Sequence, residues 1–481
     1  MSKRDNLDLS IYLVTDTAQC GSLGVAETVR QAIAAGATLV QVRDPDASDD
    51  EFLTLARQVV EVARGTGVPV LLDDRVHLVG PAGADGAHVG QHDMPVAQAR
   101  EILGPDAILG LTVETVVQLE WAIANIPRDA MDYIGLGPVR PTASKPGHVP
   151  ATGMRKLIPL ADRSPWPSVV IGGVKAADTA AVRRSGFAGV SVISAICGQP
   201  DAGAATRELV DAWTAAAEPA VALTIAGSDP SGGAGIQADL KTFSALGAFG
   251  TSVITALTAQ NTQGVAGVHV VPVEFVRSQF ETLIADVRID AVKIGMLATA
   301  ELADEVGRLL GELSVPVVLD PVMVATSGDR LLDDDAVAAI RRLVAKAEII
   351  TPNLLEAAVL LGEPEATDLD QMHAQASKLR ELGSDWVLVK GGHHLTDHAT
   401  DVLAGPDGIH EISTHVVHTN NTHGTGCTLS SALAALRPRN LDWPSTAAAA
   451  KEWITGALEH ADELGIGHGH GPVHHFYQLW K

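Results

Sequence analysis

The first 195 residues contain eight short apolar runs, rich in β-branched side chains, that alternate with alanine-rich stretches of helical character. This alternation predicts a strand for each run and a helix between successive strands. The expected strands are 11–16, 38–43, 69–74, 86–90, 108–113, 133–138, 168–174 and 189–195. Eight β/α units in about 200 residues predict a closed (β/α)8 TIM barrel, whose functional residues lie at the carboxyl ends of the strands.

Polar residues and glycines gather at those predicted strand ends. They are Arg43, Asp74, Thr112, the pair Gly172 and Gly173, and Ser194. Because the carboxyl ends of parallel barrel strands meet on one face, these residues are candidates for one site.

A second α/β pattern follows a connector and terminal helix at 199–220. The expected strands are 222–228, 252–258, 291–296, 315–322, 348–353 and 386–391. They predict an open α/β sheet that binds ligands at the carboxyl ends of its strands. Since 481 residues exceed one ordinary core, we expect two domains, 1–217 and 218–481.

Composition excludes several classes of function. A net charge of -24 with 4% aromatic residues opposes nucleic-acid binding, which needs a basic face and stacking side chains. The apolar stretches are short and the first ten residues are polar, so we expect neither a membrane span nor a signal peptide, and a cytoplasmic location. Three widely spaced cysteines argue against a disulfide framework.

Residues 421–431 form a glycine-punctuated turn that runs into a helix of small residues. Gly424 and Gly426 would let the backbone approach a ligand, and the positive end of the helix favours a phosphate. Cys427 lies at the same helix start, where we expect a lowered thiol pKa and a role as a base or hydrogen-bond partner. A capped helix with a buried cysteine is the alternative for this motif taken alone.

Seven segments of the second half, in order, resemble the hydroxymethylpyrimidine and hydroxymethylpyrimidine-phosphate kinases of thiamine biosynthesis, a ribokinase-like α/β family. The segments are 225–239, 258–262, 293–296, 319–323, 351–356, 389–392 and 421–431. The resemblance implies a pyrimidine pocket lined by Gly227, Asp239, Gln260, Met296 and Val322. A general sugar kinase is the alternative for this domain.

The same resemblance implies where ATP and Mg²⁺ bind. Asp320 and Glu356 would hold Mg²⁺ directly or through water, and Lys390 would lie near the phosphates. The remaining phosphate contacts would come from Gly424, Thr425 and Gly426, and Cys427 would activate the substrate hydroxymethyl group. We also expect a homo-oligomer formed through this domain.

The first half resembles thiamine-phosphate synthase, which joins hydroxymethylpyrimidine diphosphate to a thiazole phosphate and releases pyrophosphate. The matching segments are 12–16, 41–43, 73–75, 88–93, 135–138, 141–145, 171–174 and 192–195. The resemblance implies that Asp74 and Asp93 bind Mg²⁺. The implied contacts to the pyrimidine diphosphate are Gln41, Arg43, Asp73, Thr112 and Lys145, with Arg43 and Lys145 acting on the leaving charge. Gly172, Gly173, Ile193 and Ser194 would hold the thiazole phosphate, and Thr142 and Ser144 would bind one of the two phosphate groups.

Two residues depart from the synthase pattern. Pro45 stands where the family usually has lysine, and Asp73 where it usually has asparagine, so both changes reduce local positive charge. We expect a bifunctional transferase acting on small molecules, with no nucleic-acid or membrane partner. The alternative is a kinase whose barrel binds thiazole phosphate and regulates without catalysing synthesis.

Overall fold

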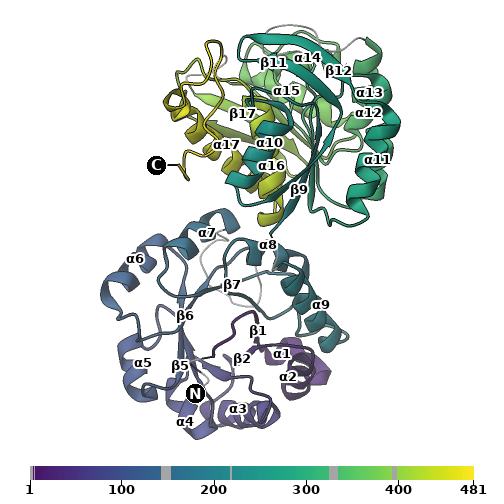
Figure 1. Cartoon of the computed structure of the whole chain (residues 1–481). Helices are drawn as coiled ribbons and strands as arrows, with labels where there is room; N and C mark the ends of the chain where they lie inside the picture. The colour runs from purple at the N-terminus through teal and green to yellow at the C-terminus, as the bar shows by residue number, and fades with distance from the viewer. Residues whose placement is uncertain are drawn as a thin grey trace. The chain divides into compact units, whose positions relative to one another are not determined.

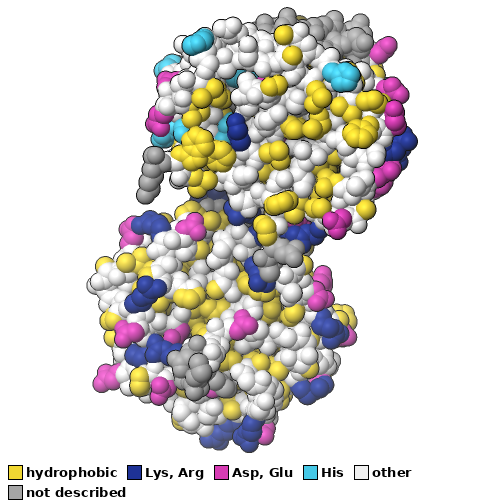
Figure 2. All heavy atoms as spheres, viewed as in Figure 1, with side chains coloured by type: hydrophobic (Ala, Val, Ile, Leu, Met, Phe, Trp, Pro, Cys, Tyr) yellow, Lys and Arg dark blue, Asp and Glu magenta, His cyan; other side chains and the backbone are white. Residues whose placement is uncertain are grey.

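The computed structural model describes residues 4, 6–141, 153–216, 219–323, 334–392 and 398–480. Contacts divide the chain into two compact units, Met1–Glu218 and Pro219–Lys481 (Figure 1). Within the described residues, no helix is long and apolar enough to cross a membrane. On the face shown in Figure 2, acidic and basic side chains are interspersed over the first unit rather than gathered into a basic patch.

The first unit is a closed barrel of eight parallel strands, as the apolar runs predict. Closure is direct, because β1 pairs with both β2 and β8. The strands are β1 (Ile11–Val14), β2 (Leu39–Val42), β3 (Val70–Asp73), β4 (Gly86–Val89), β5 (Ile108–Val113), β6 (Tyr133–Leu136), β7 (Ser168–Ile171) and β8 (Gly189–Val192).

Helices surround this barrel (Figure 1). They are α1 (Thr17–Cys20), α2 (Val25–Ala34), α3 (Asp49–Ala63), α4 (Val79–Ala82), α5 (Val96–Leu103), α6 (Val116–Asn125), α7 (Met154–Arg163), α8 (Thr179–Arg184) and α9 (Ala202–Ala215). Helix α3 shows why a helix forms at a given place in this sequence. Ser48 and Glu51 form a capping box at its start, and the helix buries Phe52, Ala56 and Val59.

Apolar side chains fill the interior of the barrel. Leu39, Leu71, Ile108 and Val169 pack there with Tyr12, Tyr133 and other buried residues. The interior of the barrel is therefore a packed core and not a pore.

The second unit is built on an eight-stranded sheet in the order β10-β9-β13-β14-β15-β16-β17-β18. Its strands are β9 (Val221–Ala226), β10 (Phe249–Ile254), β13 (Ala291–Ile294), β14 (Val317–Leu319), β15 (Ile349–Ile350), β16 (Trp386–Lys390), β17 (Ala399–Gly405) and β18 (Gly408–Thr414). The first six strands in this order run parallel, whereas β17 and β18 are antiparallel additions at one edge.

Helices cover both faces of this sheet. One core packs helices α11 (Val273–Ile284), α12 (Ala300–Leu309), α13 (Asp334–Val344), α14 (Leu354–Leu361) and α15 (Leu369–Arg380), and the other packs α10 (Gly235–Ala245), α16 (Thr425–Leu436) and α17 (Trp443–Glu459). Burial on both faces explains why the central parallel strands β9, β13, β14, β15 and β16 are largely apolar.

One expected strand is divided between two sheets. The run 252–258 was expected as a single strand, but β10 ends at Ile254 and the chain leaves the sheet. It continues as β11 (Ala256–Asn261), which pairs with β12 (Gly264–Val270) in a separate two-stranded ribbon. Thr255, at the junction, donates a hydrogen bond from its hydroxyl to Met296 O.

Candidate active sites

A cavity of about 100 Å³ opens at the carboxyl ends of the barrel strands. The expected residues that line it are Gln41, Arg43, Asp73, Thr112, Gly172, Gly173, Ile193 and Ser194. Asp74 lies in an adjoining depression, whose wall also includes Arg43, Pro45 and Asp73. Thr142, Ser144 and Lys145 lie outside the described residues.

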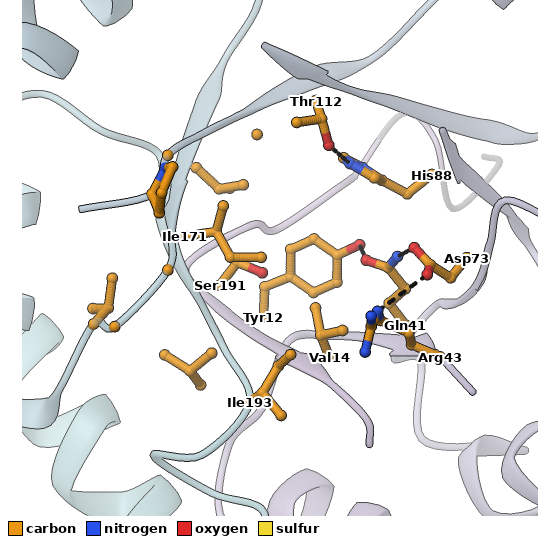
Figure 3. A pocket seen from close by; sticks show the side chains of 18 of the residues that line it. Tyr12, Val14, Gln41, Arg43, Asp73, His88, Thr112, Ile171, Ser191 and Ile193 are labelled. Atoms are coloured by element: carbon orange, nitrogen blue, oxygen red, sulfur yellow. Dashed lines mark hydrogen bonds and ion pairs between the residues drawn. The ribbon is translucent and has the colours of Figure 1, made fainter. Parts of the chain in front are cut away.

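Hydrogen bonds connect the polar side chains of the barrel wall (Figure 3). Gln41 donates from Nε2 to Asp73 Oδ1 and accepts from the Tyr12 hydroxyl at 2.6 Å. The Tyr12 and Tyr133 hydroxyl oxygens are 2.8 Å apart. His88 contacts Tyr133 through Nδ1 and Thr112 through Nε2, each at 2.9 Å.

The charge of Arg43 is partly balanced inside the site. Its Nη1 lies 3.6 Å from Asp16 Oδ2 and its Nε lies 3.4 Å from Asp73 Oδ2. Asp73 therefore contacts the cation that was expected to bind a diphosphate. Both contacts are long for charge-assisted hydrogen bonds, which leaves the guanidinium able to turn toward an anion.

Gly172 and Gly173 follow β7 in the left-handed region, with φ of 89° and 73°. A Cβ atom on Gly172 would lie 2.4 Å from Pro138 Cβ, and one on Gly173 would lie 2.9 Å from Arg140 Cβ. Both positions therefore require glycine, and only backbone faces the cavity there.

The two expected metal ligands of the barrel are solvent-exposed. Asp74 has φ of 57°, an uncommon value for a residue with a side chain, and its N–H donates to His88 O at 2.9 Å. Asp93 accepts from Gly90 N at 2.9 Å through Oδ2. Within the described parts of the chain, no group of three or more His, Cys, Asp and Glu side chains could hold a metal. Two carboxylates still suit Mg²⁺, which binds few protein ligands and completes its shell with phosphate oxygens and water.

The second unit contains a cavity of about 390 Å³ at the carboxyl ends of its parallel strands. The expected residues on its wall are Gly227, Gln260, Met296, Asp320, Val322, Glu356, Lys390, Gly424, Thr425, Gly426 and Cys427. Asp239 does not line it. Its carboxylate is fully buried behind the wall, 2.9 Å from Lys293 Nζ, and accepts hydrogen bonds from Thr224 and Ser431.

The expectation of an acidic thiol at Cys427 is wrong. Burial raises the pKa of Cys427 to about 11, although attraction to Lys293 and a hydrogen bond from the backbone of Gly235 lower it. The loss of water therefore outweighs the helix start and the nearby cation. Cys427 is a neutral thiol at neutral pH.

Lys390 pairs with one of the two carboxylates expected to bind Mg²⁺ and interacts electrostatically with the other. Its Nζ lies 2.9 Å from Asp320 Oδ1, which also accepts from Thr351 Oγ1 at 3.1 Å. Burial raises the pKa of Glu356 to about 7, although Lys390 lowers it. The site thus combines one paired carboxylate with one that titrates near neutrality.

Helix α16 begins beside these groups. Gly424 has φ of 77° and no side chain caps the helix start, so the first amides face the cavity wall without a side-chain acceptor. A Cβ on Gly426 would lie 3.2 Å from Lys390 Nζ. The missing side chain leaves room for an anion between the helix start and the lysine.

Comparisons with known proteins match both units. The family model for thiamine monophosphate synthase matches residues 11–196, and that for phosphomethylpyrimidine kinase matches 229–474. The thiamine biosynthesis bifunctional protein ThiED of Geobacter sulfurreducens is 39% identical over 98% of this chain and 95% of its own length. The chain belongs to this bifunctional thiamine-biosynthesis family. We call the barrel the synthase unit and the second unit the kinase unit, after the family models that match them.

Other relatives agree at the level of each unit. The multifunctional protein ThiED of Corynebacterium efficiens is 45% identical over 98% of this chain, which spans 65% of that relative's length. The hydroxymethylpyrimidine/phosphomethylpyrimidine kinase of Escherichia coli is 53% identical over 54% of this chain and 98% of its own length. The structure of Bacillus subtilis pyridoxal kinase in an ADP complex superposes with a TM-score of 0.51 and 34% identity, over 55% of this chain and 100% of that one.

Sequence reasoning missed several residues of the two family sites. In the kinase unit, His423 Nε2 lies 3.1 Å from Asp229 Oδ2, and both residues line the cavity. Burial opposes ionisation of Asp229, but hydrogen bonds from His423 and Ser231 hold its pKa at about 2. The signal was present, since His423 directly precedes the glycine motif.

In the synthase unit the missed residues are Tyr12, His88, Tyr133 and Ser191. Ser191 is 2% exposed, lines the cavity, and its Oγ has no hydrogen-bond partner among the described residues. Tyr12 and Ser191 are paired across β1 and β8. Strand alternation places both side chains inside the barrel, so the period of two was the available signal.

Proposed function

We propose that the kinase unit uses ATP to phosphorylate hydroxymethylpyrimidine and its monophosphate to the diphosphate. The synthase unit then couples this diphosphate with thiazole phosphate to give thiamine phosphate and pyrophosphate. The proposal rests on one observation. A bifunctional thiamine-biosynthesis protein matches both units along a single chain, over 98% of this chain. A cytoplasmic location, where ATP is supplied, belongs to the same proposal.

In the kinase unit, the pyrimidine would lie against Gly227, Gln260 and Met296, which all line the cavity. The ATP phosphates would face Lys390 and the uncapped start of α16. The substrate hydroxyl oxygen attacks the γ-phosphorus, the bond to the β-phosphate oxygen breaks, and the hydroxyl proton passes to solvent water. Proton loss is late in a loose transition state, so the neutral Cys427 thiol serves by orienting the hydroxyl.

Mg²⁺ fits the carboxylates of both sites, and when bound it neutralises phosphate charge. In the kinase unit Asp320 and Glu356 would hold it, and in the synthase unit Asp74 and Asp93 would do so. Proteins usually bind Mg²⁺ through one or two carboxylates together with substrate phosphates.

In the synthase unit, Gln41 and Thr112 would orient the pyrimidine ring deep in the barrel. The bond between the methylene carbon and the diphosphate oxygen breaks, and the thiazole nitrogen forms a new bond to that carbon. Arg43 and Lys145 would stabilise the charge of the departing pyrophosphate. The backbone of Gly172 and Gly173, with Ile193 and Ser194, would hold the thiazole phosphate, and Ser191 would donate a hydrogen bond to a substrate.

We also propose that the chain forms a homo-oligomer through the kinase unit. The β11–β12 ribbon exposes the apolar side chains of Leu257, Val268 and Val270. The register pairs Leu257 with His269 and Thr258 with Val268, so Leu257 lies on the opposite face from Val268 and Val270. An exposed apolar side chain such as Leu257 suits burial against a second copy. Light scattering of the wild-type chain and of Leu257→Lys would test this, and a monomeric wild type would contradict it.

One assay tests the two activities. The purified chain is incubated with hydroxymethylpyrimidine, ATP, Mg²⁺ and thiazole phosphate, and the products are identified by mass. We expect thiamine phosphate, and we expect Asp93→Ala to accumulate the pyrimidine diphosphate instead. If the wild-type chain accumulates that diphosphate while binding thiazole phosphate, the barrel is a regulatory unit. A preference for sugars over the pyrimidine would overturn the kinase proposal.

A further inference from the structure

A series of hydrogen bonds runs from Asp73 to Thr112 through Gln41, Tyr12, Tyr133 and His88. Figure 3 shows its two ends, Tyr12–Gln41–Asp73 and His88–Thr112. A carboxylate oxygen accepts hydrogen bonds, and Asp73 also faces the Arg43 guanidinium, whose Nε lies 3.4 Å from Asp73 Oδ2. The Gln41 amide therefore turns its NH₂ group toward Asp73 and its oxygen toward Tyr12.

Each hydroxyl in this series has one proton and can donate only once. Tyr12 donates to Gln41 Oε1 at 2.6 Å, so its oxygen accepts from Tyr133, 2.8 Å away. Tyr133 then has no proton left for His88, and its oxygen accepts from His88 Nδ1 at 2.9 Å.

The position of the proton on His88 then decides whether Thr112 donates or accepts a hydrogen bond. A neutral imidazole carries one N–H, so a proton on Nδ1 leaves Nε2 of His88 as an acceptor. The Thr112 hydroxyl, 2.9 Å from Nε2, must donate to it. Thr112 then has only lone pairs to offer to the cavity that it lines.

We propose that this series of hydrogen bonds fixes Thr112 as a hydrogen-bond acceptor, so that the barrel selects a substrate ring bearing a hydrogen-bond donor such as an exocyclic amine. Tyr12, Tyr133 and His88 act through Thr112 and are positioning residues. The inference rests on the proposed synthase function and adds the group on the pyrimidine by which the ring is recognised.

Burial of the two tyrosines keeps the direction of these hydrogen bonds fixed. Tyr12 and Tyr133 are 1% and 0% exposed, so water does not replace a missing partner. Burial also raises the pKa of both phenols above its ordinary value, so each retains its proton. Reversing one link would leave two donors or two acceptors facing each other in an apolar core, which is costly.

The direct test is the tautomer of His88 in the full chain. ¹⁵N-labelled histidine gives distinct signals for the two neutral tautomers and for imidazolium, and the His88 signals are those lost in His88→Gln. We expect the Nδ1–H tautomer in the wild type. An Nε2–H tautomer or an imidazolium would overturn the proposal.

Tyr12→Phe removes one hydroxyl from this series of hydrogen bonds, at a residue that has no hydrogen bond to His88. Tyr133 then loses its acceptor and turns its proton to His88 Nδ1, so we expect the Nε2–H tautomer. Tyr477→Phe, in the kinase unit, is the matched control and should leave His88 unchanged. An unaltered His88 tautomer in Tyr12→Phe would show that these hydrogen bonds have no fixed direction.

Calorimetry then measures the effect on recognition without requiring turnover. The probes are hydroxymethylpyrimidine diphosphate and the analogue with a carbonyl oxygen in place of the exocyclic amine. We expect Tyr12→Phe to lower the preference for the amine by about tenfold or more, because Thr112 becomes a donor. An unchanged preference would remove Thr112 as the selecting group. Failure of the wild-type chain to make thiamine phosphate would count against the proposed function instead.

Discussion

Cys427 lines the kinase cavity as a half-buried thiol near a buried cation, Lys293. We predict that Cys427→Ala lowers kinase turnover on the order of 100-fold, because the substrate hydroxyl loses its orienting partner. Synthase turnover and the circular dichroism spectrum should be unchanged. Cys197→Ala, in the barrel, is the control for loss of a buried thiol. Wild-type kinase turnover in Cys427→Ala would exclude Cys427 from catalysis.

Glu356 should make the stability of the kinase unit depend on pH. Its pKa is about 7 in the folded chain and 4.5 when unperturbed, so between these values the folded state holds a proton that the unfolded state has lost. The contribution is therefore fully present below pH 4.5 and is lost as the pH rises through 7. The upper bound is roughly 3 kcal/mol.

Denaturant unfolding at several pH values checks this prediction. The difference in unfolding free energy between Glu356→Gln and the wild type should grow in favour of the variant as the pH rises from 5 to about 8. The exposed Glu381→Gln is the matched control. A difference that stays flat across this range would mean that Glu356 titrates normally.

At the scale of elements, the loop after β7 depends on a residue without a side chain. We predict that Gly172→Ala destabilises the synthase unit by about 2–3 kcal/mol, through both the left-handed backbone and the contact with Pro138. Affinity for thiazole phosphate should fall as well. Gly65→Ala is the matched control, because Gly65 has φ of 79° but open space around it.

Thermal unfolding and calorimetry measure the two effects. The control should cost about 1 kcal/mol, from backbone strain alone. Equal losses in Gly172→Ala and Gly65→Ala would show that the Pro138 contact is relieved at little cost. An unchanged affinity in Gly172→Ala would argue against a phosphate at this loop.

The elements that the sequence predicts well are those with continuous apolar runs. The barrel strands follow this pattern, and the closed barrel is confirmed. Strands β11, β12 and β18 were not predicted as such, because they are partly exposed. Strand β17 was also missed, although all but its first residue are buried. Local sequence also could not predict the pKa of Cys427, because that pKa depends on burial and on charged groups contributed by distant segments.

The order of the motifs predicted which segments contribute to one cavity better than it predicted whether each side chain faces that cavity. Gln41 and Thr112 are separated by many residues but line one wall. Asp239 belongs to a matching segment and nevertheless lies behind the wall, paired with Lys293. A carboxylate on a helix can face either way, and only the packing of α10 against α16 decides which.

At the scale of the whole molecule, each unit has cores of its own. One core cluster lies entirely within the barrel, and two others lie entirely within the second unit. We predict that fragments 1–217 and 218–481 each fold and that the second fragment keeps kinase turnover. Circular dichroism and turnover measurements on the purified fragments check this. An insoluble or inactive second fragment would show that the units depend on each other.

The pairing of β1 with β8 has a consequence for synthesis on the ribosome. The barrel is made first, and once β8 has joined β1 it presents no unpaired strand edge. The kinase sheet, made second, has open edges at β10 and β18. Its emerging strands therefore find no template on the finished barrel, so this order of units protects the nascent chain from pairing between the two sheets.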